Sequence, residues 1–193
     1  MKIIFATQNP NKIKEIQNML PANINIVGLQ DIHVNEDIPE TAPTLNGNAQ
    51  LKANFIWKKF QLPCFADDTG LEVEALNGEP GVRSARYAGE VKNDGANIQL
   101  LLNKLQNIPN RFAHFRTCFC FIHKNETHFF EGKIEGEIAI EKLGQNGFGY
   151  DPIFVPKGYK KTFAQMTLAE KNKISHRAKA LEKLLNHLNN LIV

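Results

Sequence analysis

Cysteine and long apolar runs are both scarce in this 193-residue chain, and each shortage excludes a class of protein. The three cysteines, Cys64, Cys118 and Cys120, form no even disulfide framework, which argues against a disulfide-stabilised secreted scaffold and for a reducing compartment. The apolar stretch within MKIIFATQNPNK is too short for the core of a signal peptide or for a membrane span. We therefore expect a cytoplasmic protein with no membrane partner.

The chain also lacks a large excess of either positive or negative charge. The net charge of +3 comes with no basic stripe or tail, so we expect no nucleic-acid partner, and any basic chemistry must be local. What the chain does contain is typical of a soluble globular protein: 42% hydrophobic residues, 22% charged residues and 13 phenylalanines for a core. The length favours a single domain over residues 1–193.

Hydrophobic periodicity predicts strands and helices that alternate along the chain. Strands are expected at residues 2–6, 63–66, 71–75 and 153–155, with a two-stranded hairpin over 112–138 that turns near 124–126. Helices are expected after the turn TQNPN, at about 44–60, from Asp94 as the cap to a point before Pro109, and over the last segment from Thr167. This interleaving predicts a mixed α/β fold.

The turn ATQNPNK has the character of a phosphate site. A polar turn that opens a helix offers backbone N–H groups and the positive end of the helix dipole, and Lys12 adds an ammonium. The turn lacks the GxxxxGK[ST] pattern, so an ordinary connection between strand and helix is the alternative.

The stretch FADDTG places two acids, Asp67 and Asp68, side by side, and we expect them at the end of a strand. A solvated turn is one interpretation. The other is a Mg²⁺ site, because a hard cation prefers oxygen ligands and needs only one or two protein carboxylates when substrate phosphates supply the rest. The earlier acids Glu36, Asp37 and Glu40 offer a distant partner, although the same acids are also typical of a solvated loop.

Two further segments hold groups that suit a nucleotide. In EKNKISHR, the side chains of Lys171, His176 and Arg177 could clamp phosphate or donate to a base carbonyl. On one regular helix, at about 100° per residue, they diverge, so either the helix breaks near Ser175 or they form a solvated basic face. In GFGYD, two glycines flank Phe148 and could let its ring approach a flat base, although a structural loop fits equally well.

A rival metal site is offered by HFRTCFCFIH, which holds two histidines and two cysteines. Structural zinc takes its cysteines from a turn, two to four residues apart, whereas these alternate within an expected strand. We therefore expect no zinc site here.

Four motifs, in order and over essentially the whole chain, resemble the Ham1/RdgB-type inosine triphosphate pyrophosphatases. They are ATQNPNK, FADDTGLEVEALNGEPGVRSARYAG, GFGYDP and EKNKISHRAKAL. The resemblance implies an α/β fold of the Maf/Ham1 type with an elongated central sheet flanked by helices. It also implies a Mg²⁺-dependent, homodimeric hydrolase that cleaves the deaminated purine nucleotides ITP, dITP and XTP to the monophosphate and pyrophosphate.

The resemblance assigns roles by motif position. Asp68 would be a metal ligand and the general base, with Glu40 as the second metal ligand and Lys52 as the lysine of the NAxxKA helix. The phosphates would be held by Thr7, Gln8, Asn9, Pro10, Asn11 and Lys12. Substrate would also be bound by Thr69, by Phe148, Gly149, Tyr150 and Asp151 around the base and sugar, and by Lys171, His176 and Arg177. Many relatives carry an acid where this chain has Gly47, and the role of Asp67 is left open.

Two alternatives belong to other functional classes. A Maf-like nucleotide pyrophosphatase would share the architecture but prefer other bases, and the SHR motif, Ser175 to Arg177, argues against it. A nucleotide-binding module without hydrolysis would keep the phosphate turn but would have no need of the acid pair.

Overall fold

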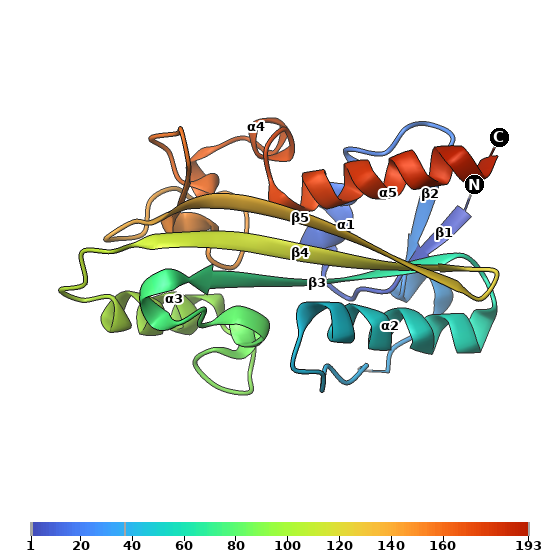
Figure 1. Ribbon diagram of the computed structural model, residues 1–193, viewed down its shortest axis with the longest axis horizontal. Coiled ribbons are helices and arrows are strands. Elements are labelled where there is room, and N and C mark those ends of the chain that lie inside the picture. Colours follow the sequence, from blue (N-terminus) through green and yellow to red (C-terminus); the bar gives the residue numbers. More distant parts are fainter. Residues whose placement is uncertain (1, 37, 193) are drawn as a thin grey trace. The chain divides into compact units, whose positions relative to one another are not determined.

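The computed structural model describes residues 2–36 and 38–192, and its strands form one mixed sheet (Figure 1). The strand order is β2-β1-β3-β4-β5-β6. Strand β1 is parallel to both β2 and β3, whereas β5 and β6 are antiparallel. The mixed α/β prediction is therefore confirmed.

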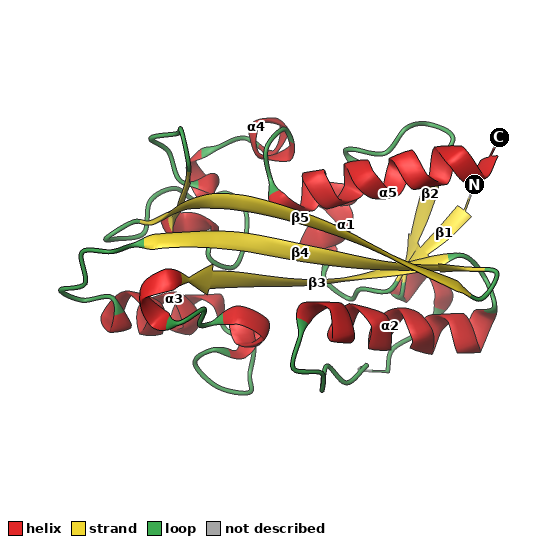
Figure 2. Ribbon diagram, viewed as in Figure 1, coloured by secondary structure: helices red, strands yellow, loops and turns green. Residues whose placement is uncertain are grey.

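Strand β2 was not predicted from the sequence, but most other element boundaries lie within a few residues of the predicted ones. The strands are β1 (Lys2–Phe5), β2 (Asn25–Gly28), β3 (Cys64–Val73), β4 (Phe112–His123), β5 (Glu126–Ile138) and β6 (Phe154–Pro156). The α-helices are α1 (Pro10–Gln17), α2 (Leu45–Phe60), α3 (Asp94–Lys104), α4 (Leu168–Asn172) and α5 (His176–Ile192). Strands β4 and β5 form the predicted hairpin, drawn as two long neighbouring strands in Figure 2.

The chain divides into two compact units. The first comprises residues 1–68, 117–132 and 177–193, and the second comprises residues 69–116 and 133–176. The expectation of a single domain stays a prediction. No helix within the described residues is both long and apolar enough to cross a membrane.

In the first unit, period-two alternation along the strands sorts side chains onto two faces. On one face, Phe5, Phe65 and Phe119 pack with the apolar residues of α1 and α5, and the Phe5 and Phe65 rings stack with their centroids 4.3 Å apart. On the other face, Ala66 and Cys120 pack against α2. Figure 1 accordingly shows α2 and α5 on opposite sides of these strands.

The second unit has its own core. Leu71 and Val73 of β3, Phe115 of β4 and Phe154 of β6 are buried there with the apolar side of α3. Rings make up much of this core, with Phe115 and Phe154 in edge contact at 4.7 Å between centroids. The glycine-rich loop and α4 belong to this unit. The motifs predicted to bind the base therefore lie in the unit that contains this second core.

Two sequence expectations about boundaries were wrong. The acids Asp67 and Asp68 do not lie at a strand end, because one strand runs from Cys64 through both of them to Val73. The strand continues past the acids because Leu71 and Val73 anchor its second half in the second core. The cap of α3 is Asn93, whose side chain accepts from the N–H of Ala96, and Asp94 is the first residue of the helix.

The last segment is two helices rather than one. Thr167 and Glu170 form the predicted capping box at the start of α4, which ends at Asn172, and α5 begins at His176. The helix therefore breaks around Ser175, which is one of the two outcomes that the divergent directions of the basic residues allowed.

The buried cysteines give a first prediction. Burial raises the pKa of the Cys64 and Cys120 thiols to about 12, and all three cysteines are shielded from solvent in the first unit. Because the thiolate is the reactive form, we expect a thiol reagent at neutral pH to label no cysteine of the native protein and all three in guanidinium chloride. Fast labelling of a native thiol would mean that this core opens readily.

Candidate active site

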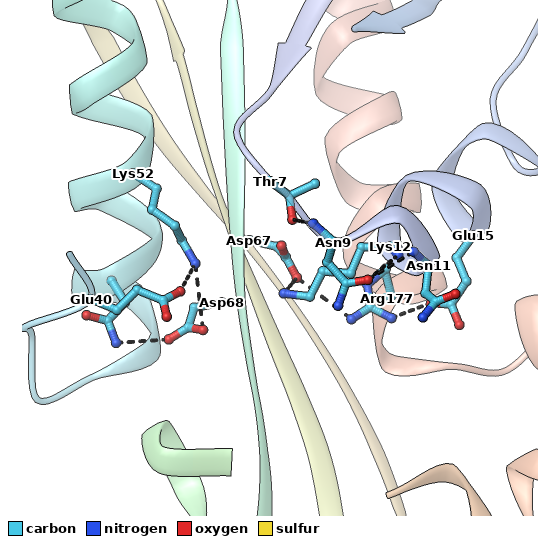
Figure 3. Close-up of polar contacts among 11 residues, drawn as sticks. Thr7, Asn9, Asn11, Lys12, Glu15, Glu40, Lys52, Asp67, Asp68 and Arg177 are labelled. Carbon is cyan, nitrogen blue, oxygen red and sulfur yellow. Dashed lines mark hydrogen bonds and ion pairs between the residues drawn. The ribbon is translucent and has the colours of Figure 1, made fainter. Parts of the chain in front are cut away.

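The two adjacent acids of β3 point to opposite faces of the sheet. Phe65 faces α1 and α5, and Asp67, two residues on, faces the same way; Ala66 faces α2, and so does Asp68. Figure 3 shows the result: Asp67 lies with Lys12 and Arg177, whereas Asp68 lies with Glu40 and Lys52. Both residues are largely buried, with Asp67 1% and Asp68 8% exposed, so the interpretation as a solvated turn is wrong.

On the α2 side, Asp68 and Glu40 share one lysine. The ammonium of Lys52 forms an ion pair with Glu40 and lies 3.8 Å from Oδ1 of Asp68. The amide of Asn48 donates to Oδ2 of Asp68 over 3.1 Å, and its own oxygen accepts from the N–H of Ala42 over 2.9 Å. Asn48 and Lys52 are four residues apart, so one face of α2 presents both groups to the acid.

Burial and charge oppose each other in this group. Burial raises the pKa of Asp68, against the lowering effect of Lys52. Burial acts to lower the pKa of Lys52, but Asp68 and Glu40 outweigh it and raise the pKa. The outcome is a firmly charged lysine beside a carboxylate whose affinity for a proton is increased, which is a property required of a general base.

On the opposite face, Asp67 joins a buried network. The ammonium of Lys12 lies 2.7 Å from Oδ2 of Asp67, and Nη2 of Arg177 lies 3.7 Å from the same oxygen. Arg177 also donates through Nη1 to Glu15 of α1. Burial acts to raise the pKa of Asp67, but Lys12 and Arg177 outweigh it and lower the pKa to about 2.

The turn between β1 and α1 is organised by its own side chains. Asn9 caps α1 by accepting from the N–H groups of Asn11 and Lys12, over 2.9 and 3.3 Å, and Thr7 accepts from the N–H of Asn9 over 3.2 Å. These amides, which the sequence suggested for phosphate, already have partners. The ammonium of Lys12 has three donors, of which Asp67 needs only one, and it is therefore the group of this turn best suited to phosphate.

The remaining members of the turn are peripheral. Pro10 is the first residue of α1, and Gln8 is exposed and donates to the carbonyl of Glu36 over 3.1 Å. Glu36 is itself paired with Lys59 at the surface, over 2.8 Å. The acidic segment is thus split: Glu40 joins Lys52, Glu36 faces solvent, and Asp37 lies outside the described residues.

In the second unit, Asp151 organises the glycine-rich loop. Its carboxylate accepts from the N–H of Phe148 over 2.9 Å and forms an ion pair with Lys171 at 2.5 Å. The ammonium of Lys171 also lies 5.0 Å from the centroid of the Phe148 ring and 5.3 Å from that of Phe163. Lys171 and the GFGYD loop, predicted from separate motifs, therefore meet.

The rest of the predicted base-binding set lies in the same unit, except Arg177, which belongs to the first unit. Gly149, at φ +59, donates its N–H to Asp94 over 2.7 Å, and the hydroxyl of Tyr150 donates to the carbonyl of Ser84 over 3.0 Å. His176 is buried and stacks on Phe115 with the ring centroids 4.6 Å apart. Thr69 follows Asp68 in β3 and is half-buried.

The predicted residues therefore form two groups, one in each unit. Sequence reasoning missed two members of the first: Asn48 and Glu15, both buried. Asn48 could have been predicted from its spacing to Lys52 on one face of the same helix, but no local sequence signal indicated Glu15. Within the described residues, no group of three or more His, Cys, Asp or Glu side chains could hold a metal ion, and His114, a member of the rejected zinc motif, pairs with Glu72.

Comparison with known proteins identifies the family. A model of the Ham1 family matches residues 3–187. The chain belongs to the Ham1 family. It is 55% identical over 190 residues to a dITP/XTP pyrophosphatase of Flavobacterium psychrophilum, covering 98% of this chain and 100% of that protein. It is also 48% identical over 185 residues to a dITP/XTP pyrophosphatase of Bacillus subtilis, covering 94% and 93%.

Solved structures of the family have the same fold. The Ham1 protein of Staphylococcus aureus superposes with a TM-score of 0.89 at 43% identity, covering 98% of this chain and 99% of that one. A HAM1 protein of Coxiella burnetii gives a TM-score of 0.90 at 39% identity, with the same coverage. The Ham1-type fold expected from the motifs is thus confirmed for this family member.

The low pKa of Asp67 predicts how stability depends on pH. Because the pKa is lowered in the folded protein, the stabilisation is present above the unfolded value near 4 and is lost as pH falls toward about 2. We expect Asp67→Asn to be less stable than the wild type at neutral pH. The difference between their free energies of unfolding should shrink by on the order of 2 kcal/mol as the pH falls from about 4 to about 2. Urea unfolding across this pH range measures the gap, and a gap that stays constant would contradict the prediction.

Proposed function

We propose that this chain hydrolyses the deaminated purine nucleoside triphosphates ITP, dITP and XTP to the monophosphate and pyrophosphate, and so removes them from the nucleotide pool. The observation that carries the proposal is the group formed by Glu40, Lys52 and Asp68, where two carboxylates and an ammonium meet beside a buried strand. A module that only binds nucleotides would have no need of such an acid pair. The relatives described as dITP/XTP pyrophosphatases support the same reaction and disfavour the Maf-like alternative.

Mg²⁺ is the cofactor that fits this donor set. Glu40 and Asp68 offer hard carboxylate oxygens and both contact Lys52, so a single cation can lie within reach of the two. Two protein carboxylates are enough for Mg²⁺ when substrate phosphates complete its coordination. When bound, Mg²⁺ would neutralise charge on the triphosphate.

The protein groups can then carry the reaction. Asp68 takes a proton from the attacking water, whose oxygen forms a bond to the phosphorus next to the nucleoside while the bond from that phosphorus to the pyrophosphate oxygen breaks. The buried position of Asp68 favours proton acceptance because burial raises its pKa. Lys12 and Lys52 stabilise the charge on the phosphate oxygens and on the departing pyrophosphate.

Base selectivity is assigned to the second unit. Deamination replaces the 6-amino group of adenine by a carbonyl acceptor, so a site built around donors favours the deaminated base and rejects the amino group. Lys171 is the donor best placed for this, because its ammonium lies beside the Phe148 ring and has further donors besides the one directed at Asp151, whereas the N–H groups of Phe148 and Gly149 already donate to Asp151 and Asp94. The motifs imply that His176 and Arg177 bind substrate, and donation from either to the base carbonyl stays a prediction; Arg177 is engaged with Glu15 and Asp67.

Homodimerisation, which rests on the family resemblance, and a cytoplasmic location, which rests on the few cysteines and the short apolar stretch at the start of the sequence, complete the proposal. Light scattering coupled to size-exclusion chromatography measures the first. A monomeric mass for the active protein would remove the dimer from the proposal without affecting the reaction.

The first functional test is pyrophosphate release with Mg²⁺. We expect turnover of ITP, dITP and XTP, with ATP, dTTP and UTP far slower, and we expect Asp68→Asn to lower kcat by about 10²- to 10⁴-fold because it removes the base at nearly constant shape. A circular-dichroism melt checks that the variant is folded. Wild-type turnover in Asp68→Asn would exclude Asp68 as the base, and a preference for dTTP or UTP would favour the Maf-like alternative.

The role of Glu40 is tested through the Mg²⁺ titration. We expect Glu40→Gln to raise the Mg²⁺ concentration needed for half-maximal activity, because one carboxylate ligand is lost. Glu36→Gln is the matched control, since Glu36 lies in the same acidic segment but pairs with Lys59 at the surface. Identical Mg²⁺ titrations for Glu40→Gln and the control would exclude Glu40 as a metal ligand.

A further inference from the structure

The network around Asp67 has the form of a chain of four charges. Glu15 pairs with Arg177, Nη2 of Arg177 lies 3.7 Å from Asp67, and Asp67 lies 2.7 Å from the ammonium of Lys12. Two carboxylates and two cations alternate, so the group is neutral as a whole. A buried set of charges is tolerated when each charge has an opposite partner, as here.

The four charged side chains of this network differ in their exposure to solvent. The side chains of Arg177 and Asp67 are each 1% exposed and that of Glu15 is 5% exposed, whereas Lys12 is 14% exposed. Lys12 is therefore the member best placed to reach a ligand. The other three anchor it from the core side, as Figure 3 shows for the contacts among α1, β3 and Arg177.

Asp67 has no place in the metal set described above. Its carboxylate is turned to the face of the sheet opposite Asp68 and Glu40, and cations already occupy its surroundings. A second positive ion there would be repelled by both Lys12 and Arg177. The role of Asp67 must come from what it does to its neighbours.

We propose that Asp67 is a positioning residue for the reaction: its carboxylate holds the Lys12 ammonium in place at the turn before α1, and Glu15 and Arg177 hold Asp67. The inference rests on the proposed function, in which Lys12 binds the triphosphate. A lysine ammonium has three donors, so a single acceptor can orient it and leave donors for phosphate. Its four-carbon stem is otherwise flexible, and a misplacement of about 1 Å can cost on the order of 100-fold in rate.

A double-mutant cycle tests the role, using Asp67→Asn, Lys12→Met and both together, with ITP and Mg²⁺. We expect Asp67→Asn to lower kcat by at least about tenfold without raising KM, since losing a negative charge beside Lys12 does not weaken the binding of an anion. In the Lys12→Met background the same change should alter kcat/KM by less than about threefold, because the group that Asp67 positions is already gone.

Stability supplies a second readout from the same four proteins. Each single substitution leaves an unbalanced charge in the buried network, whereas the double substitution restores neutrality. We therefore expect the double variant to be more stable than either single variant and yet no more active than Lys12→Met. If Asp67 supported only the fold, the double variant would be more active than Lys12→Met, because activity would rise with stability.

The matched control is Glu72→Gln. Glu72 is a half-buried carboxylate of the same strand, paired with Arg116 at 2.7 Å and with His114, and its contacts do not include Lys12. We expect wild-type kcat and KM from this variant. A loss in the control equal to that in Asp67→Asn would mean that any broken ion pair on β3 impairs the enzyme, and would overturn the specific role.

Other outcomes are equally decisive. If Asp67→Asn keeps wild-type kcat, or lowers it as much without Lys12 as with it, the positioning role is wrong. If Asp67→Asn fails to fold, the cycle is run with Asp67→Glu, which keeps the charge; a displaced ammonium should lower kcat only where Lys12 is present, and wild-type kcat would overturn the proposal. If the wild type is active but the effects of the two substitutions on kcat/KM simply add, the positioning role alone is refuted. If the wild type releases no pyrophosphate, the proposed function is refuted as well.

Discussion

Successive residues of a strand point to opposite faces of its sheet, and this constraint organises the first unit. It turns Phe65 and Asp67 toward α1 and α5, and Ala66 and Asp68 toward α2. Two carboxylates adjacent in sequence are thereby separated by the thickness of the sheet. Their mutual repulsion is reduced, and each has room for a cation of its own.

Each acid is compensated from a different helix. Lys52 of α2 serves Asp68 and Glu40, whereas Lys12 of α1, together with Arg177 of α5, serves Asp67. The chemistry differs accordingly. On one face, Asp68 has a raised pKa beside a shared lysine; on the other, cations keep Asp67 ionised, with a pKa near 2. Two adjacent residues thus have different properties: Asp68 is suited to accept a proton, and Asp67 is suited to fix the position of a neighbouring cation.

The sequence predicted most of the elements, because long amphipathic helices and alternating strands have clear periods. It placed the acids at a strand end because Asp and Gly are common turn formers, and only the anchoring of Leu71 and Val73 in a second core carries the strand through them. The resemblance assigned Lys171 and Asp151 to the substrate site, but the ion pair between them was not predicted. Glu15 could not be foreseen, since its partner Arg177 lies 162 positions further along the chain.

Helix α5 carries members of two buried clusters, because Arg177 lies in its first turn and Leu181, Leu184 and Leu188 follow along it. Each residue of an α-helix turns the chain by about 100°, so inserting or deleting one residue between Arg177 and Leu181 would rotate one cluster relative to the other. Arg177 could then meet Glu15 and Asp67 only if the leucines turned away from the apolar residues that they pack against. The length of this stretch of α5 is therefore as constrained as the identity of its side chains.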